Sequence, residues 1–443
     1  MMHSWKGRLI CACAALLFWN QPVHAAPQIQ EITAEGDRKA WLIEDHKLPF
    51  VTLRIVFERG GAVYDPQALP GVAYFTASMM NEGAGDMDSL AFNRKLEDHA
   101  VRFAAEAGED TMTVSMQTLS EFKDASFDLL ALALNKPRFD AAAVERVRAE
   151  LFTALRQAQE DPGYLASLNW KERAFPGHPY HRAKIGTQES ITAIKRDDLQ
   201  AFQESHLLCG AKDIAVVGDI KPAEVKTLLT KLFPSRECGA VQTAVPQVQI
   251  ADGDGKPVAV SHDVPQAVIR ASVPGVMRND PRYYAFVVLN NILGGNLMTS
   301  RMGQEIRDKR GLAYYAYSEA GGFEHGAFMA MNFATRASEA QTAIDVFTTI
   351  LQQLRDKGVT QDELDEAKRY LTGSFPLGLD SQNSLAEYLD SMQRYHLGID
   401  YLTKRNQLLE AVTLQQVNTL AKELLAHKPL LVMVGPISEG VHK

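Results

Sequence analysis

The chain has 443 residues, 46% of them apolar and 23% charged, which is the composition of a globular protein long enough for two or more domains. Acidic side chains outnumber basic ones by 54 to 46, so the formal net charge is −8. This acidic balance gives no electrostatic basis for binding nucleic acid and excludes that class of function.

Residues 1–25 have the pattern of a secretory signal peptide. Lys6 and Arg8 precede an apolar run from Leu9 to Trp19, and small residues allow cleavage after Ala25 or Ala26. The run has 11 residues, too few for a membrane anchor. We therefore expect a periplasmic protein with no membrane insertion after cleavage. Its net charge would be −10, because Lys6 and Arg8 are the only charged residues removed.

The first half of the mature chain mixes strands and helices. Strands are predicted where β-branched residues gather or where apolar and polar side chains alternate. Helices are predicted where apolar side chains recur every three or four residues. The predicted strands are 50–56, 112–116 and 214–217, and the predicted helices are 71–80, 127–134, 141–159 and 222–233.

The second half repeats the first at an offset of about 217 residues. Residues 193–199 and 214–220 correspond to 411–417 and 431–437, and the strand 50–56 corresponds to 267–273. Such a period is too long for a solenoid and indicates two homologous domains. We place them at 27–235 and 258–443, joined by a linker at 236–257 rich in Pro, Gly, Asp and Gln. The expected fold class is α/β (an α+β sandwich), each domain being a mostly antiparallel sheet covered by helices.

Two cysteines remain after signal cleavage. Cys209 precedes the predicted strand 214–217, and Cys238 follows the predicted helix that starts at Pro222. A helix returning antiparallel to the strand would bring the two sulfurs together, and an exported protein permits a disulfide. The alternative, two unlinked small apolar residues, stays open at this point.

Two distant segments carry a more specific signal. The first is Arg59-Gly60-Gly61-Ala62-Val63-Tyr64 with Gly71-Val72-Ala73-Tyr74-Phe75-Thr76-Ala77-Ser78-Met79. The second runs from Asn290-Asn291-Ile292-Leu293-Gly294-Gly295-Asn296 to Arg310-Gly311-Leu312-Ala313-Tyr314. Together they resemble the two halves of the pitrilysin/insulinase family of zinc peptidases, over most of the mature chain. The resemblance implies a clamshell of two domains around a chamber that holds a peptide.

The matching zinc motif has lost its ligands. In the family, the helix Gly-x-x-His-x-x-Glu-His binds zinc through two His, and its Glu acts as the base. Those three positions are Tyr74, Ala77 and Ser78 in this chain. They would share a helix face, but none offers a zinc ligand or a base. We therefore expect no metal and no cofactor in this chain.

Other Glu and His residues could in principle belong to a remnant of the metal site. The family's third ligand is a Glu on a later helix, and Glu145, Glu150 and Glu160 lie in the matching region, with none singled out. His178 and His181 form a pair in a loop, but a pair without a third ligand is a weak metal signal. We expect this His-Pro-Tyr-His loop to be structural.

Arg307 and Tyr314 have the spacing of an Arg and a Tyr that reach the zinc site from the family's C-terminal half. The resemblance implies that the phenol donates to the developing oxyanion and that the guanidinium clamps a peptide carbonyl. Gly294 and Gly295, in the same segment, are assigned to substrate binding. Without the resemblance, Arg307 would be an ordinary charged surface residue beside Lys309 and Arg310.

These residues lead to two hypotheses. Some bacterial members of the family divide the labour between a subunit with the zinc motif and a second subunit that supplies the Arg and Tyr. The first hypothesis is that this chain is such a second subunit. Its partners would be a homologous zinc-binding subunit and a peptide substrate. The alternative is a structural or peptide-binding protein of the same fold without a catalytic role.

Overall fold

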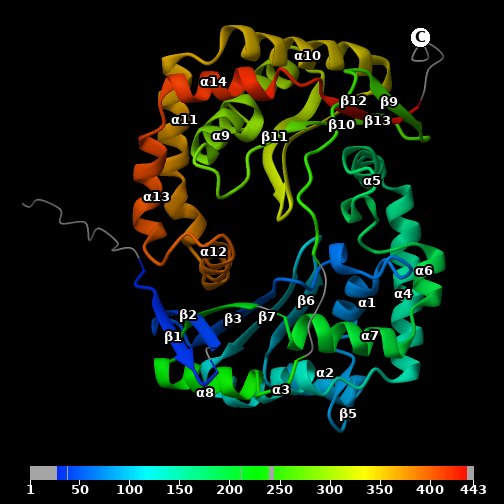
Figure 1. Cartoon of the computed structure of the whole chain (residues 1–443), viewed down its shortest axis with the longest axis vertical. Helices are drawn as coiled ribbons and strands as arrows, with labels where there is room; N and C mark the ends of the chain where they lie inside the picture. The colour runs from blue at the N-terminus through cyan, green and yellow to red at the C-terminus, as the bar shows by residue number, and fades with distance from the viewer. Residues whose placement is uncertain (1–26, 37, 211, 239–243, 437–443) are drawn as a thin grey trace, which may run out of the picture.

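The computed structural model describes residues 27–36, 38–210, 212–238 and 244–436. The predicted signal peptide lies outside these residues, as does part of the predicted linker. The described chain forms two halves, one above the other in Figure 1, and each half is built on one large sheet.

The N-terminal half has its strands and helices in mixed order, as predicted. Its strands are β1 (Gln30–Ala34), β2 (Arg38–Glu44), β3 (Phe50–Phe57), β6 (Arg102–Ala107), β7 (Met112–Leu119) and β8 (Lys212–Gly218), with a small hairpin of β4 (Gly83–Ala84) and β5 (Met87–Asp88). Its helices are α1 (Val72–Ser78), α2 (Ser89–Asp98), α3 (Lys123–Asn135), α4 (Ala141–Glu160), α5 (Pro162–Ala174), α6 (Gln188–Ala193), α7 (Arg196–Phe202) and α8 (Pro222–Leu232).

The C-terminal half has fewer strands and longer ones. They are β9 (Pro257–Ser261), β10 (Gln266–Pro274), β11 (Ala313–Phe323), β12 (Gly326–Arg336) and β13 (Leu430–Gly435). Its helices are α9 (Tyr283–Asn290), α10 (Ala340–Lys357), α11 (Gln361–Gly373), α12 (Gln382–Arg394), α13 (Tyr401–Glu410) and α14 (Leu414–Leu424). Arg307 lies on a π-helical turn, Gly303–Asp308.

The two sheets have the same strand order. The first reads β1-β2-β8-β3-β7-β6, and the second, read from its β9 edge, reads β9-β13-β10-β12-β11. Each contains one parallel pair, β2 with β8 or β9 with β13, and the other pairs are antiparallel. The expected pair of homologous domains with mostly antiparallel sheets is therefore confirmed, and β1 is an addition to the first sheet.

Each sheet has one face covered by a helix from the opposite half. Helix α12 packs on β3 and β8, where Leu389 is buried beside Ala215 and Val217. Helix α5 packs on β10 and β13, where Trp170 is buried beside Val432. Nothing in the local sequence pattern indicated this exchange. It joins the halves through packed helices as well as through the chain between them.

Polar contacts follow the same exchange. Arg54 on β3 donates through Nε to Asp390 Oδ2 on α12 at 2.9 Å. At the matching place in the other half, Arg270 on β10 lies 4.5 Å from the ring centroid of Trp170. The indole Nε1 of Trp170 donates to Ser272 Oγ at 2.7 Å, so its buried polar group is satisfied.

The chain also contains one covalent cross-link. Cys209 and Cys238 form a disulfide with Cα atoms 5.6 Å apart, which resolves the alternative left open by the sequence. The bond closes a loop that contains β8 and α8. In the part of the chain that the structure describes, no helix combines the length and the apolar character needed to cross a membrane.

Candidate functional site

The helix of the degenerate motif, α1, begins at a turn fixed by Asp65 and Gly71. Gly71 has φ +97°, and a Cβ there would lie 2.5 Å from the carbonyl oxygen of Ile185, so glycine is required. The buried carboxylate of Asp65 accepts from the N–H groups of Gly71 and Ala73 at 2.6 and 2.9 Å. These bonds satisfy donors at the helix start. Burial raises the pKa of Asp65 to about 7.

Tyr74, Ala77 and Ser78 line a cavity of about 350 Å³ between α1 and β6. Ser78 Oγ donates to the carbonyl oxygen of Tyr74 at 3.0 Å, and Ala77 is buried. Lys184 Nζ lies 6.0 Å from the ring centroid of Tyr74. A phenol, a methyl group and an internally bonded hydroxyl beside an ammonium do not make a zinc ligand set. The helix keeps its position, but its residues do not fit the metal.

Two of the three candidate third ligands, Glu145 and Glu150, have other partners. Glu150 Oε1 accepts from Arg146 Nη1 at 2.9 Å, and Glu145 accepts from Arg148 at 3.3 Å, both within α4. Both carboxylates are exposed. They are helix-surface ion pairs and show no sign of a remnant ligand.

The two loop histidines are bound to backbone groups. His178 Nε2 lies 3.0 Å from the carbonyl oxygen of Pro246, and its Nδ1 accepts from the N–H of Tyr180 at 3.2 Å. His181 Nδ1 lies 2.6 Å from the carbonyl oxygen of His178. The geometry gives this loop a structural use.

Strand β6 forms one edge of the first sheet, beside the cavity. Among the described strands it pairs with β7 alone. Ala105, Glu106 and Ala107 of β6 line the cavity together with α1. An unpaired strand edge offers N–H and C=O groups with which an extended peptide can form another strand. The residues of β6, Arg-Phe-Ala-Ala-Glu-Ala, include no β-branched side chain, so the sequence pattern does not indicate a strand there.

Arg307 and Tyr314 lie at the surface of the other half. Tyr314, at the start of β11, is 91% exposed and therefore has no packing role. Arg307 Nε donates to Asp308 Oδ1 at 2.8 Å, and its Nη2 lies 3.5 Å from the sulfur of Met298. The pKa of Arg307 is raised, first of all by the bond to Asp308.

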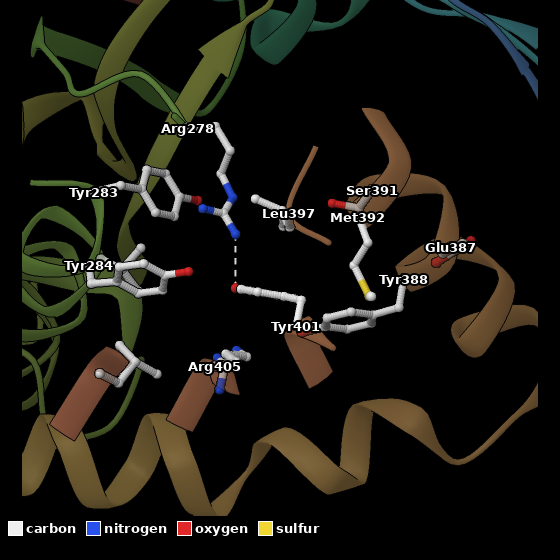
Figure 2. Close-up of a pocket in the computed structure, with 12 residues that line it drawn as sticks. Arg278, Tyr283, Tyr284, Glu387, Tyr388, Ser391, Met392, Leu397, Tyr401 and Arg405 are labelled. Carbon is white, nitrogen blue, oxygen red and sulfur yellow. Dashed lines mark hydrogen bonds between the residues drawn. The ribbon is translucent and has the colours of Figure 1, made fainter. Parts of the chain in front are cut away.

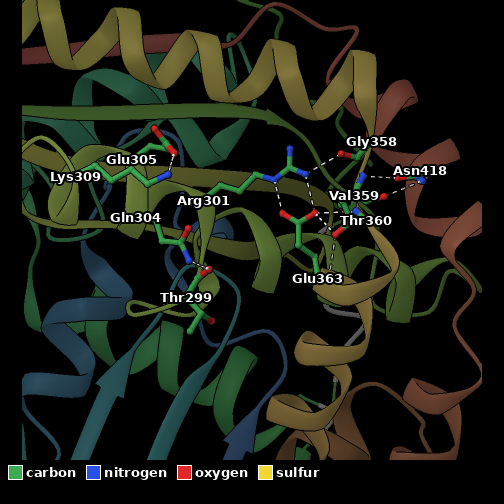
Figure 3. A network of polar contacts seen from close by, with 10 residues as sticks. All are labelled: Thr299, Arg301, Gln304, Glu305, Lys309, Gly358, Val359, Thr360, Glu363 and Asn418. Carbon is green, nitrogen blue, oxygen red and sulfur yellow. Dashed lines mark hydrogen bonds and ion pairs between the residues drawn. The ribbon is translucent and has the colours of Figure 1, made fainter.

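The segment that carries Arg307 is anchored at its base (Figure 3). Arg301 binds both carboxylate oxygens of Glu363 through Nε and Nη2 at 2.8 and 2.9 Å, a bidentate pair. Lys309 and Arg310 each bind Glu305 at 2.5 Å. Of the basic residues on this turn, Arg307 is the one that lies against the exposed Met298.

Gly294 and Gly295 occupy different surroundings. Gly294 is buried under β11, where a Cβ would lie 2.4 Å from the backbone nitrogen of Ser318. Close packing therefore explains Gly294. Gly295 is exposed. Their assignment to substrate binding stays a prediction.

Within one chain, the degenerate zinc helix α1 does not lie beside Arg307 and Tyr314. Helix α1 lies in the lower half of Figure 1 and β11 in the upper half. Neither Arg307 nor Tyr314 lines the cavity at α1. Among the residues that the structure describes, no hydrogen bond or ion pair joins them to α1.

A polar cluster between the halves was missed by sequence reasoning. The buried carboxylate of Asp110 accepts from the hydroxyl of Tyr180 and, at 3.0 Å, from the N–H of Glu324. Ligand atoms of Asp110, Glu324 and His325 lie within 4.8 Å of one another. Arg394 Nη2 lies 3.5 Å from Asp110 and 4.0 Å from Glu324, so a positive charge already stands beside both carboxylates. The cluster is an ion-pair joint assembled from distant parts of the sequence.

Comparisons with known proteins agree with this geometry. Residues 39–188 match the family described as Insulinase (Peptidase family M16), and residues 193–371 match the family described as Peptidase M16 inactive domain. A crystal structure of a peptidase M16 inactive domain from Pseudomonas fluorescens has a TM-score of 0.85 and 28% identity. The match covers 93% of this chain and 98% of the chain in that crystal structure.

Curated relatives have similar lengths and differing descriptions. The non-peptidase homolog YmxG of Helicobacter pylori is 28% identical over 383 residues, covering 86% of this chain and 87% of its own. The uncharacterized zinc protease YmxG of Bacillus subtilis is 23% identical, covering 85% of this chain and 91% of its own. In this chain the residues at 74, 77 and 78 decide between the two descriptions, and they are those of an inactive homologue.

Proposed function

We propose that this chain, which belongs to peptidase family M16, is the non-catalytic subunit of a periplasmic heteromeric zinc endopeptidase. One contrast carries the proposal. The zinc-helix positions are Tyr74, Ala77 and Ser78, whereas Arg307 and the fully accessible Tyr314 remain at the surface of the other half. An exposed tyrosine with no packing role is better explained by contact with another molecule than by the fold.

The active site would be shared between two chains. The partner is a homologous subunit with an intact His-x-x-Glu-His helix, which supplies the zinc and the base. Tyr314 donates its phenolic proton as a hydrogen bond to the oxyanion that develops on the scissile carbonyl. Arg307 holds the peptide by a neighbouring carbonyl.

The peptide substrate would be held by strand addition. The open edge of β6 lies beside a cavity of about 350 Å³ that includes Glu106 and Lys184. Backbone pairing along an edge strand binds an extended peptide with little dependence on its side chains. A charged carboxylate and ammonium in the adjoining cavity give a place for polar substrate side chains.

Export is part of the proposal. Residues 1–25 have the charge and apolar pattern of a signal peptide, and the Cys209–Cys238 disulfide fits an oxidising compartment. A purely structural role for the same fold is the second candidate. The buried joint of Asp110, Tyr180 and Arg394, which fixes the halves together, is the observation that favours it.

Reconstitution tests the pairing. The mature chain is co-expressed with a secreted homologue that carries an intact zinc motif, and both are also purified alone. We expect the two chains to co-elute in size-exclusion chromatography. Cleavage of a quenched fluorescent peptide should require both. If the partner alone cleaves as fast as the mixture, the proposed division of labour is wrong.

A further inference from the structure

A second cavity, of about 340 Å³, lies in the C-terminal half between α9, α12 and α13 (Figure 2). It shares no lining residue with the cavity at α1. Two arginines, four tyrosines and several aliphatic side chains form its wall. The proposed function uses none of them.

The guanidinium of Arg278 lies at the centre of this cavity (Figure 2). Its Nη2 donates to the hydroxyl oxygen of Tyr401 at 2.8 Å. Its Cζ lies 4.2 Å from the ring centroid of Tyr283 and 5.6 Å from that of Tyr284. Such cation–π contacts hold the group in place without neutralising its charge. Among the described residues, no carboxylate forms an ion pair with Arg278.

A second guanidinium on the wall is held in the same way. Arg405 Nη1 donates to the carbonyl oxygen of Leu371 and to Asn406 Oδ1, both at 3.1 Å. Its Cζ lies 4.1 Å from the ring centroid of Phe375. These partners are neutral, and no ion pair to Arg405 is found within the part of the chain that the structure describes.

The one acidic residue on the wall is directed elsewhere. Glu387 is 64% exposed, and its Oε1 lies 3.7 Å from Arg54 on β3 of the opposite half. Figure 2 shows it apart from the Arg278 guanidinium. The cavity therefore contains two positive charges that no neighbouring acid offsets.

The tyrosine hydroxyls add hydrogen-bond donors. Those of Tyr283, Tyr284 and Tyr401 point toward the Arg278 guanidinium (Figure 2). Burial raises the pKa of Tyr283 and of Tyr401, so both phenols remain protonated at neutral pH. Protonated phenols beside guanidinium groups form a surface that favours an oxyanion.

The remainder of the wall is apolar. Val287, Met392, Leu397 and Leu409 line the cavity, and the ring of Tyr388 lies beside Met392 (Figure 2). A small inorganic anion would leave this part of the volume unfilled. A ligand with one charged end and one apolar end uses both parts of the wall.

We propose that this cavity binds a carboxylate carried by an apolar group. The carboxylate accepts from the free N–H groups of the Arg278 guanidinium and from a tyrosine hydroxyl beside it, and the apolar group contacts Met392 and Leu397. Two sources share this chemistry, a free organic acid and the C-terminal residue of a peptide. The proposal does not depend on a catalytic partner, because every residue in it belongs to one half of this chain.

Calorimetric titration of the isolated mature chain tests the site. The probes are N-acetyl-leucine, its neutral amide and inorganic phosphate. We expect N-acetyl-leucine to bind about 10- to 100-fold more tightly than the amide, the ratio for hydrogen bonds to a charged group. It should also bind more tightly than phosphate. Equal affinity for the acid and the amide overturns the proposal. Tighter binding of phosphate than of N-acetyl-leucine overturns the proposed contact between the ligand and the apolar wall.

Variants assign the binding to these residues. Arg278→Lys keeps the charge but loses the planar fork, so affinity for N-acetyl-leucine should fall about tenfold or more. Tyr401→Phe keeps the ring and should weaken binding severalfold. Arg282→Gln is the matched control, because Arg282 lies nearby but is paired with Asp280 and Glu423 at 2.8 and 2.9 Å.

The outcome does not rest on one variant. If Arg278→Lys fails to fold, Tyr401→Phe and Tyr284→Phe decide, since each removes only a hydroxyl. Wild-type affinity in all folded variants overturns the site. A peptide ending in leucine, with a free or an amidated C-terminus, separates the sources. Competition by the free-ended peptide identifies a chain end as the ligand, and its failure to compete identifies a free acid.

Discussion

Single residues show that this chain has kept the frame of a metal site without its chemistry. Asp65 and Gly71 fix the start of α1 through two hydrogen bonds and a close backbone approach. The three positions that would carry the zinc ligands and the base have become Tyr74, Ala77 and Ser78. The resemblance in sequence located these positions, because the glycine and its helix are local features.

The isolated mature chain should bind no stoichiometric zinc. The reason is the absence of a ligand set at Tyr74, Ala77 and Ser78, together with the guanidinium of Arg394 beside the Asp110 cluster. Elemental analysis after dialysis measures this directly. One zinc retained per chain contradicts the account, and loss of that zinc in His325→Ala would assign it to the joint between the halves.

A half-buried carboxylate on β8 makes stability depend on pH. Asp213 Oδ2 is buried without a hydrogen-bond partner. Burial, and then Glu58 and Asp390, raises the pKa of Asp213 to about 7, against the opposing effect of Arg394. An unfolded aspartate titrates near pH 4. The folded chain therefore binds the extra proton between about pH 4 and 7, and this group's contribution to stability falls as pH rises through that window.

Asp213→Asn should remove that pH dependence. The difference in unfolding free energy, variant minus wild type, should be larger at pH 8 than at pH 5. The limit is about 1.4 kcal/mol per pH unit, and the effect should be smaller here because Asp213 is only partly buried. Urea unfolding at both pH values measures it, with the exposed Glu172→Gln as control. An equal shift at both pH values would show that Asp213 titrates normally.

Among the elements, the central strands were predictable and the exchange of helices was not. The predicted strand 50–56 is β3 (Phe50–Phe57), and 267–273 is β10 (Gln266–Pro274), because both are buried and rich in β-branched residues. Periodicity shows which face of α12 is apolar. It does not show which half of the molecule covers that face.

Trp170→Ala tests the exchanged helix α5. The indole is buried against the opposite sheet and donates to Ser272. Truncation of such a group costs about 3–5 kcal/mol of unfolding free energy. Denaturant titration measures the loss, and Glu172→Ala, an exposed change on the same helix, should cost little. A loss below about 1 kcal/mol would show that α5 contributes little to joining the halves.

For the whole molecule, the duplication was visible in the sequence and the site was only partly so. The constant offset between matching segments of the sequence predicted two similar domains, and the two sheets have the same strand order. Residues that meet across the halves, such as Asp110 with Tyr180 and Arg394, are too far apart in the chain for any local pattern to pair them. The positions of Arg307 and Tyr314 came from the resemblance, and their burial and neighbours came from the fold.

The loss of the zinc ligands at α1 explains why the proposed function requires a second chain. This chain retains an exposed Tyr314 but has no zinc helix of its own to complement it. A partner that carries the zinc ligands would complete one active site, formed by residues of both chains.

The most direct measurement is steady-state cleavage of a quenched fluorescent peptide by the purified heteromer carrying Tyr314→Phe. Only a hydroxyl is lost, so assembly should be unchanged in size-exclusion chromatography. We expect kcat to fall about 10²–10³-fold, the scale for one oxyanion donor, with KM nearly unchanged. Tyr315→Phe, at the neighbouring half-buried tyrosine, should retain the wild-type rate. Wild-type cleavage by an assembled Tyr314→Phe heteromer would contradict the account and leave this chain a structural role.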